Sequence, residues 1–152
     1  MTIIEDTRQQ AEKHEKKHEY FKEKDIKVIR SKLPIGDYAR LDNLSVVIDT
    51  KKNIQELILD VTKDHTRFRN ELLRAKENGI KLIILVENEE KVKAKTDLLD
   101  WYNWRLKTNP KATTGKMLFK IISTMEDKYG VKFQFCDIED TPAIIKNILE
   151  NL

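Results

Sequence analysis

The sequence predicts an α/β domain in which a mixed sheet is flanked by helices on both faces. Apolar segments of strand length alternate with segments whose apolar residues recur at helical spacing, as in layered α/β domains. Residues 80–86 are apolar at all but one position, which favours a strand buried on both faces. Asp42-Asn43 lies between two strand-like segments and indicates a hairpin turn, so we expect a mixed sheet rather than an all-parallel one.

The first third of the chain is expected to form four strands and one long helix. Residues 2–5 predict a short opening strand, and Asp6-Thr7 can then cap a charged helix over 8–24. The apolar anchors of this helix are Ala11 and the Tyr20-Phe21 pair. Further strands are expected at 26–30, 38–41 and 44–49, with a turn at 33–37. The segment 44–49 is apolar enough to be a central strand.

The remainder of the chain is expected to alternate helices with two strands. Phe68, Leu72 and Ala75 recur at helical spacing, and Asn78-Gly79 is a C-terminal stop signal. The expected helices are 54–61, 66–78, 98–106, 112–129 and a last one opened by Thr141-Pro142. Strands are expected at 80–86 and 131–135.

Length and composition favour one cytoplasmic domain spanning residues 1–152. The chain is 39% hydrophobic and 36% charged, which permits a core beneath a heavily charged surface. No apolar run is long enough for a membrane span, and the N-terminus lacks the apolar core of a signal peptide. Cys136 is the only cysteine, which excludes intramolecular disulfides and a cysteine-rich zinc module.

Basic residues are unevenly distributed along the chain. Residues 8–32 hold nine Lys or Arg against five acids, and residues 91–120 hold eight against two. Such segments suit a polyanion such as nucleic acid, but solvated helix faces explain them equally well.

The strongest functional signal is the combination of Asp37, Asp49 and Lys51. Asp37 lies in a Gly-Asp-Tyr turn, and Asp49 and Lys51 end an apolar strand. Because alternate residues of a strand share a face, Asp49 and Lys51 should project together, and Asp37 could meet them from a neighbouring strand. Carboxylates hold hard cations such as Mg²⁺, which assist phosphodiester hydrolysis, and the lysine can orient water or stabilise developing charge. Charged residues are also common at strand ends, so the spacing alone does not establish a site.

Two further patterns have competing interpretations. His14-Glu15-Lys16-Lys17-His18 matches the His-Glu-x-x-His zinc signature, but the lysines would repel a dication, so we favour a charged exposed helix. Trp101, Tyr102 and Trp104 lie in the second basic segment. These aromatic residues suit stacking on unpaired bases, a dimer interface or core packing.

The order of motifs along the whole chain resembles the XPF-type nuclease domain, a branch of the PD-(D/E)xK restriction-endonuclease-like superfamily. Family members open with Asp-x-Arg-Glu, continue with Gly-Asp-Tyr and carry the hallmark Glu-Arg-Lys followed by an acid. Later come an Arg-bearing helix, a buried strand ending near a Glu, and a closing helix. The matching segments here are Asp6-Thr7-Arg8, Gly36-Asp37-Tyr38, Asp49-Thr50-Lys51, Arg67-Phe68, 83–87, Lys111-Ala112 and Tyr129-Gly130-Val131.

The chain departs from this pattern at several positions. Gln9 stands where Glu is usual, Asp49 replaces Glu, and Thr50 replaces Arg. The nearest acid after Lys51 is Glu56, one residue later than usual. These departures indicate a divergent member of phage or bacterial type.

The resemblance implies a restriction-endonuclease-like fold and a Mg²⁺- or Mn²⁺-dependent endonuclease acting on branched DNA in repair or recombination. Asp37 and Asp49 would bind the metal with the Thr50 carbonyl and Glu56, and Lys51 would position or activate the water. Asp6 and Arg8 would sit beside the site. Residues expected to contact DNA are Arg8, Arg67, Trp101, Trp104, Arg105 and Lys111. A homodimer or a partner protein would help to grip the branch.

Some of these assignments have structural alternatives. Asp6 could simply cap the first helix, Arg67 could form a surface salt bridge, and Glu56 could be a solvated helix residue. For the whole chain, the rival is a catalytically silent DNA-binding or protein-interaction module on the same fold. The substituted hallmark residues favour this rival, whereas the retained Lys51 opposes it.

Overall fold

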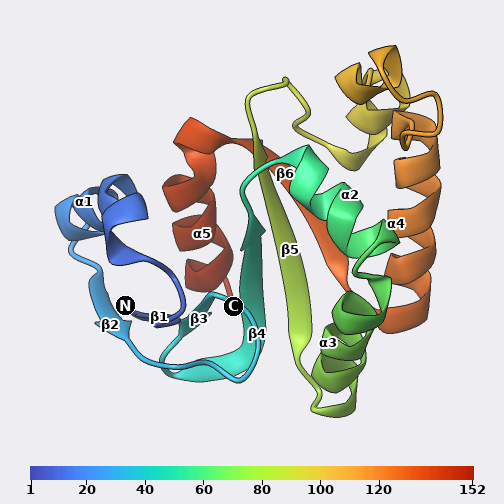
Figure 1. Cartoon of the computed structure of the whole chain (residues 1–152). Coiled ribbons are helices and arrows are strands. Elements are labelled where there is room, and N and C mark those ends of the chain that lie inside the picture. Colours follow the sequence, from blue (N-terminus) through green and yellow to red (C-terminus); the bar gives the residue numbers. More distant parts are fainter.

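A six-stranded mixed sheet forms the centre of the computed structural model, which describes residues 1–152 (Figure 1). Its strands are β1 (Thr2–Glu5), β2 (Lys27–Arg30), β3 (Tyr38–Arg40), β4 (Asn43–Lys51), β5 (Lys81–Asn88) and β6 (Lys132–Asp137), in the spatial order β2-β1-β3-β4-β5-β6. Strands β4, β5 and β6 are parallel, and β1 is parallel to β2. Strand β3 is antiparallel to both of its neighbours, so the prediction of a mixed sheet is confirmed.

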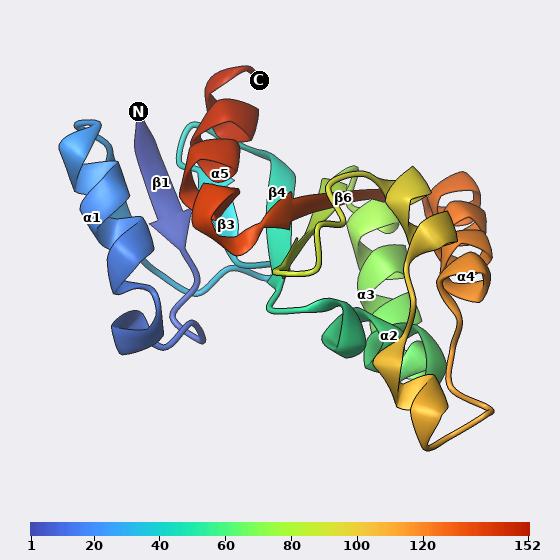
Figure 2. The same cartoon turned by 90° about the horizontal axis from the view of Figure 1, so that it is seen from above.

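Helices cover both faces of this sheet, as predicted (Figure 2). One face carries α1 (Glu15–Glu23) and α5 (Thr141–Glu150), and the other carries α2 (Ile54–Thr62), α3 (His65–Glu77) and α4 (Gly115–Tyr129). Short 3-10 helices complete the chain: η1 (Ala11–Lys13), η2 (Lys95–Asp100), η3 (Trp104–Lys107) and η4 (Ile138–Asp140). None of these helices has the length and apolar character that crossing a membrane requires.

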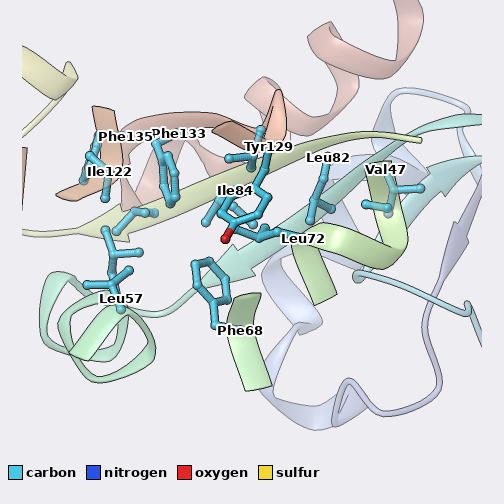
Figure 3. Close-up of a cluster of buried hydrophobic side chains, with 14 of the residues drawn as sticks. Val47, Leu57, Phe68, Leu72, Leu82, Ile84, Ile122, Tyr129, Phe133 and Phe135 are labelled. Carbon is cyan, nitrogen blue, oxygen red and sulfur yellow. The ribbon is translucent and has the colours of Figure 1, made fainter. Parts of the chain in front are cut away.

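Each face of the sheet buries its own apolar cluster. The larger cluster packs α2, α3 and α4 against the sheet. Figure 3 shows side chains of this cluster, among them Phe68 and Leu72 of α3 and Phe133 of β6. The smaller cluster lies under α1 and α5 and includes Ile48 of β4. Val47, one residue earlier, belongs to the larger cluster. The alternation of side chains along β4 therefore directs odd-numbered residues to the α2–α3 face.

Two predicted helices differ from the structure. The helix expected over 8–24 begins only at Glu15, because the Asp6 carboxylate binds the backbone N–H of Arg8 and of Leu33 instead of capping a helix. The helix expected over 98–106 is replaced by η2 and η3. Asn103, buried between them, accepts from the Arg105 N–H and donates to the Thr113 carbonyl, which fixes an irregular path.

Candidate active site

A cavity of about 350 Å³ lies on the α2–α3 face of the sheet and contains most of the charged residues of interest. We call it the acidic cavity. Its lining residues are Arg8, Gln9, Pro34, Ile35, Gly36, Asp37, Asp49, Lys51, Asp60, Arg67, Phe68, Glu71 and Arg74. The structure thus brings together five residues selected from the sequence: Asp37, Asp49, Lys51, Arg8 and Arg67.

Asp37 is fixed by the turn that precedes β3. Gly36 has φ +76°, and a Cβ there would overlap the Val47 side chain, so this turn requires glycine. The Asp37 N–H donates to the Ile48 carbonyl at 2.8 Å. The Asp37 Oδ2 accepts both the N–H and the hydroxyl of Thr50, each at 2.8 Å. These bonds hold the Asp37 carboxylate at the end of β4 with its other oxygen available.

Lys51 lies between two carboxylates at the floor of the acidic cavity. Its Nζ is 3.0 Å from Asp49 Oδ2 and 2.8 Å from Asp60 Oδ2. The three residues are buried. The two carboxylates therefore share one ammonium as their charged partner. A cation bound at Asp49 would have to share that carboxylate with Lys51.

The electrostatics of the acidic cavity follow from this crowding. Burial raises the pKa of Asp49 well above its usual value, and Asp37 and Glu71 add to the rise against the opposing effect of Lys51. Burial also raises the pKa of Glu71, with a contribution from Asp37. For Lys51, burial lowers the pKa, but Asp49 and Asp60 outweigh it, and the net pKa lies above the usual value. Lys51 is therefore protonated at neutral pH.

Asp60 and Glu71 were missed by the sequence analysis. Asp60 is the one charged residue in the apolar run Leu57–Val61 of α2, and it is 6% exposed. Glu71 lies midway in a charged stripe on α3, four residues after Arg67 and three before Arg74. For Asp60, the signal in the sequence was an acidic residue within an apolar helix face. For Glu71, it was a row of charged residues at helical spacing beside the apolar row of the same helix.

Asp6 and Arg8 form a brace beside the acidic cavity. The Arg8 Nε donates to Asp6 Oδ2 at 2.6 Å, and its Nη2 donates to the Leu33 carbonyl at 2.9 Å. Asp6 is fully buried and does not line the cavity, whereas Arg8 does. Asp6 therefore acts on the cavity only through Arg8 and the turn at Leu33.

Thr50 hydrogen-bonds to Asp37 through its N–H and its hydroxyl, whereas Glu56 does not line the acidic cavity. Both border a different cavity on the α1–α5 face, in accord with the even-numbered position of Thr50 on β4. The Glu56 Oε2 accepts the Lys52 N–H at 3.2 Å, and the Glu56 N–H binds the capping Asn53 side chain. The structure places Glu56 at the start of α2, where it contributes to the helix terminus.

The predicted aromatic and basic DNA contacts also lie outside the acidic cavity. Trp101 is half-buried against the larger apolar cluster. Trp104 is 54% exposed, and the Arg105 guanidinium lies 5.1 Å from its ring centre. Arg105 and Lys111 border a third cavity of about 400 Å³ between α2 and the η3 segment. Arg67 is largely exposed and only loosely paired with Asp60 and Asp64, at 3.9 and 3.8 Å.

The histidine pair does not form a zinc site in this structure. His14 precedes α1, and its Nδ1 lies 3.2 Å from Lys17 Nζ. His18 instead contacts the Glu5 carboxylate at 2.9 Å. The two rings thus serve different partners.

The acidic cavity suits a hard divalent cation. No group of three or more His, Cys, Asp or Glu side chains converges tightly enough to enclose an ion. Mg²⁺, however, is usually held by one or two carboxylates, with waters and substrate phosphates completing its shell. Asp37 and Asp49 supply two carboxylates in one cavity, and one oxygen of Asp37 is left free by its bonds to Thr50. The donor set is all oxygen, which favours Mg²⁺ or Mn²⁺ over zinc.

Comparison with known proteins gives a family and a fold. The model of the ERCC4 domain matches residues 6–148. Among curated proteins there is no significant match. Two similar solved structures are XPF from Aeropyrum pernix and the same protein in complex with DNA, each 17% identical to this chain, with TM-scores of 0.70 and 0.67. The similarity covers 99% of this chain but 64% of the XPF chain, and at this identity it shows the fold alone.

Proposed function

The chain belongs to the ERCC4 domain family, and from this premise we propose that it is a metal-dependent endonuclease that hydrolyses phosphodiester bonds in branched DNA. The XPF-type resemblance of its motifs and the expected fold are both confirmed. The observation that carries the proposal is the convergence of Asp37, Asp49 and Lys51 in one cavity. One similar XPF structure contains DNA, which supports DNA as the substrate. The branched substrate and a place in repair or recombination belong to the proposal.

In the proposed site, Asp37 and Asp49 would hold Mg²⁺ or Mn²⁺. The bound ion would polarise the scissile phosphate and acidify a water molecule. Thr50 holds the Asp37 carboxylate through two hydrogen bonds, which leaves one oxygen of Asp37 free for this role. The raised pKa of Asp49 means that a cation and a proton compete for the same carboxylate.

Lys51 would stabilise charge rather than act as a general base. Its pKa is raised by Asp49 and Asp60, so it carries a proton at neutral pH and cannot accept another. A fixed ammonium can orient the attacking water and stabilise negative charge as it develops on the phosphate. Asp60 is then a positioning residue, because it holds the ammonium from the side of α2.

Exposed cationic side chains around the acidic cavity would bind the DNA backbone. Arg8, Arg67 and Arg74 line its rim and are exposed. Arginine suits this task because its planar donors match phosphate oxygens. Trp104, Arg105 and Lys111 do not line the acidic cavity, and we assign them to an outlying strand of the branch, with Trp104 stacking on unpaired bases.

A catalytically silent binding module is the second candidate function. One observation favours it: in this structure the Lys51 ammonium already occupies the space between Asp49 and Asp60 and would compete with a metal ion. The free carboxylate oxygen of Asp37 and the open cavity favour the enzyme.

A cleavage assay on matched DNA structures separates the two functions. Purified protein is incubated with flap, fork, Holliday-junction and plain duplex DNA, in Mg²⁺ or Mn²⁺ and in excess chelator. The endonuclease proposal requires cleavage of at least one branched substrate that stops with the chelator. Tight binding to a junction without cleavage under either ion would establish the binding module instead.

A further inference from the structure

A second cavity, which we call the lysine cavity, lies on the opposite face of the sheet from the acidic cavity. Its volume is about 430 Å³, within the range of small-ligand sites. It opens at the carboxyl ends of β4 and β5, between the starts of α1 and α5. Its lining residues are Gln9, Lys13, His14, Lys16, Lys17, Thr50, Lys52, Glu56, Glu87, Ile138, Glu139 and Pro142.

The acids of the lysine cavity are already engaged, whereas two of its ammonium groups are free. Glu87 is buried and lies 3.0 Å from Lys17, and the exposed Glu139 lies 3.8 Å from Lys16. Glu56 accepts a backbone N–H, as described above. The remaining ammonium groups, those of Lys13 and Lys52, are exposed and have no carboxylate within 4.0 Å. The lining holds four lysines against three glutamates, which leaves one net positive charge, and Lys13 and Lys52 are the lysines without a paired carboxylate.

His14 adds a hydrogen-bond donor to these free cations. An ammonium can only donate, so the Lys17 Nζ contact makes His14 Nδ1 an acceptor and places the ring proton on Nε2. Burial and the neighbouring Lys17 lower the pKa of His14, which keeps the ring neutral at pH 7. No protein atom accepts from Nε2. The Nε2–H has no partner within the protein and can donate to a ligand in the lysine cavity, which His14 lines.

The starts of two helices reinforce the preference for an anion. His14, Lys16 and Lys17 belong to the start of α1, and Pro142 belongs to the first turn of α5. Neither helix has a side chain that caps its N-terminus. The positive ends of both helix dipoles therefore border the same cavity.

The lysine cavity and the acidic cavity adjoin at the edge of the sheet. Gln9 lines both of them. Thr50 lines the lysine cavity, while its hydroxyl binds Asp37 in the acidic cavity. Gln9 and Thr50 therefore lie between the two cavities, and a strand that passes them from the acidic cavity reaches Lys13, His14 and Lys52.

We propose that the lysine cavity is a phosphate-binding subsite for a DNA strand whose neighbouring phosphodiester lies in the acidic cavity, with Lys13, Lys52 and His14 Nε2–H as its donors. The inference rests on the proposed function. The phosphate is either internal to a continuous strand or the 5′ end of an interrupted one at the branch. Both kinds of phosphate would bind to the same donors, and DNA substrates with and without a 5′ phosphate at the branch distinguish them.

The test is a binding titration of the full chain in excess chelator, so that no cleavage occurs. Fluorescence anisotropy with a labelled fork is compared for wild type and for the double variant Lys13→Ala/Lys52→Ala. The matched control is Lys81→Ala/Lys132→Ala, which removes two exposed, unpaired lysines at the amino ends of β5 and β6, the far edge of the sheet. All three proteins are measured from low to moderate salt.

The subsite predicts a dissociation constant raised about tenfold in the first variant and a shallower salt dependence. Each lost phosphate contact on a single strand removes about 0.7 from the slope of log K against log salt. A His14→Phe variant should weaken binding without changing this slope, because the ring is neutral. Inorganic phosphate should compete for wild type and not for the lysine variant. Forks with and without a 5′ phosphate at the branch then separate a terminal phosphate from an internal one.

The subsite is wrong if the two double variants bind with equal affinity and equal salt slope. That result leaves the nuclease proposal intact, since cleavage is measured separately with metal present. Conversely, if the chain binds DNA through Lys13 and Lys52 but never cuts it, the subsite proposal stands and the endonuclease proposal is wrong. A wild-type chain that neither binds nor cuts DNA overturns both.

Discussion

The Lys51 ammonium of β4 lies 2.8 Å from the Asp60 carboxylate of α2, which joins the sheet to the helix that covers it. Both side chains are buried, and the second carboxylate at Lys51 is that of Asp49. A lysine held from two sides has little conformational freedom. This arrangement makes the geometry of the acidic cavity depend on α2 as well as on β4.

Replacement of Asp60 by Asn tests this positioning. With one carboxylate lost and burial unchanged, the pKa of Lys51 falls, so Lys51 loses its proton at a lower pH than in wild type. Cleavage should drop roughly 10- to 100-fold at neutral pH. Single-turnover rates at neutral pH measure this effect, with the fold checked by thermal unfolding. A folded Asp60→Asn protein that cuts at the wild-type rate would mean that Asp60 has only a structural role.

Glu71→Gln should stabilise the metal-free protein at high pH. Burial and Asp37 raise the pKa of Glu71, against Lys51, so its ionised form is disfavoured in the folded state. The cost is present above the raised pKa and vanishes as pH falls towards the ordinary glutamate value of about 4.3. We expect a gain of roughly 1 kcal/mol at pH 8 and almost none at pH 4. Urea unfolding at the two pH values measures it; a less stable variant at pH 8 contradicts the account.

Asp6→Asn should destabilise the fold. Burial raises the pKa of Asp6, but hydrogen bonds from Arg8 and Leu33 outweigh it, so the net pKa is lowered. The stabilisation is therefore present above the unfolded pKa of about 3.9 and is lost as pH falls through the lower folded value. The loss at pH 7 should be about 2 kcal/mol. Thermal unfolding of Asp6→Asn is compared with Asp127→Asn, an exposed and unpaired control. Equal losses of stability in the two variants would mean that the bonds of Asp6 to Arg8 and Leu33 do not stabilise the fold.

Arg67→Ala should weaken DNA binding and its dependence on salt. Arg67 lies at the rim of the acidic cavity and is 82% exposed, so its loss should leave the free energy of unfolding almost unchanged. The slope of log K against log salt should fall by about 0.9 for a duplex contact. Arg69→Ala, an exposed residue of the same helix outside the cavity, is the control. Equal salt slopes for Arg67→Ala and Arg69→Ala would mean that the DNA does not contact Arg67.

The sheet and the pair Asp49 and Lys51 were predictable because both follow from local periodicity. The apolar segments 44–49 and 80–86 indicated central strands, and side-chain alternation placed Asp49 and Lys51 on one face. Gly36-Asp37 indicated a turn, and the structure requires glycine there. Their convergence with Asp37 in one cavity agrees with that expectation.

The features that escaped prediction depend on partners distant in sequence. From the sequence, Asp6 was a plausible helix cap. In the structure its carboxylate accepts the N–H of Leu33, which is distant in sequence. Asp60 faces Lys51 only because α2 crosses that end of β4, and no pattern along the chain encodes this crossing. The helix expected over 98–106 is absent because the buried Asn103 side chain bonds to Gln55 and Thr113, and these bonds fix a different backbone path.

The most direct test of the central claim is the single-turnover cleavage rate of Asp49→Asn on the best branched substrate in Mg²⁺ or Mn²⁺. Asn keeps the volume of Asp49 but removes its charge, and the fold is checked by circular dichroism and thermal unfolding. We predict a folded protein whose rate falls at least about 100-fold. A folded Asp49→Asn protein that cuts as fast as wild type would contradict the proposed site.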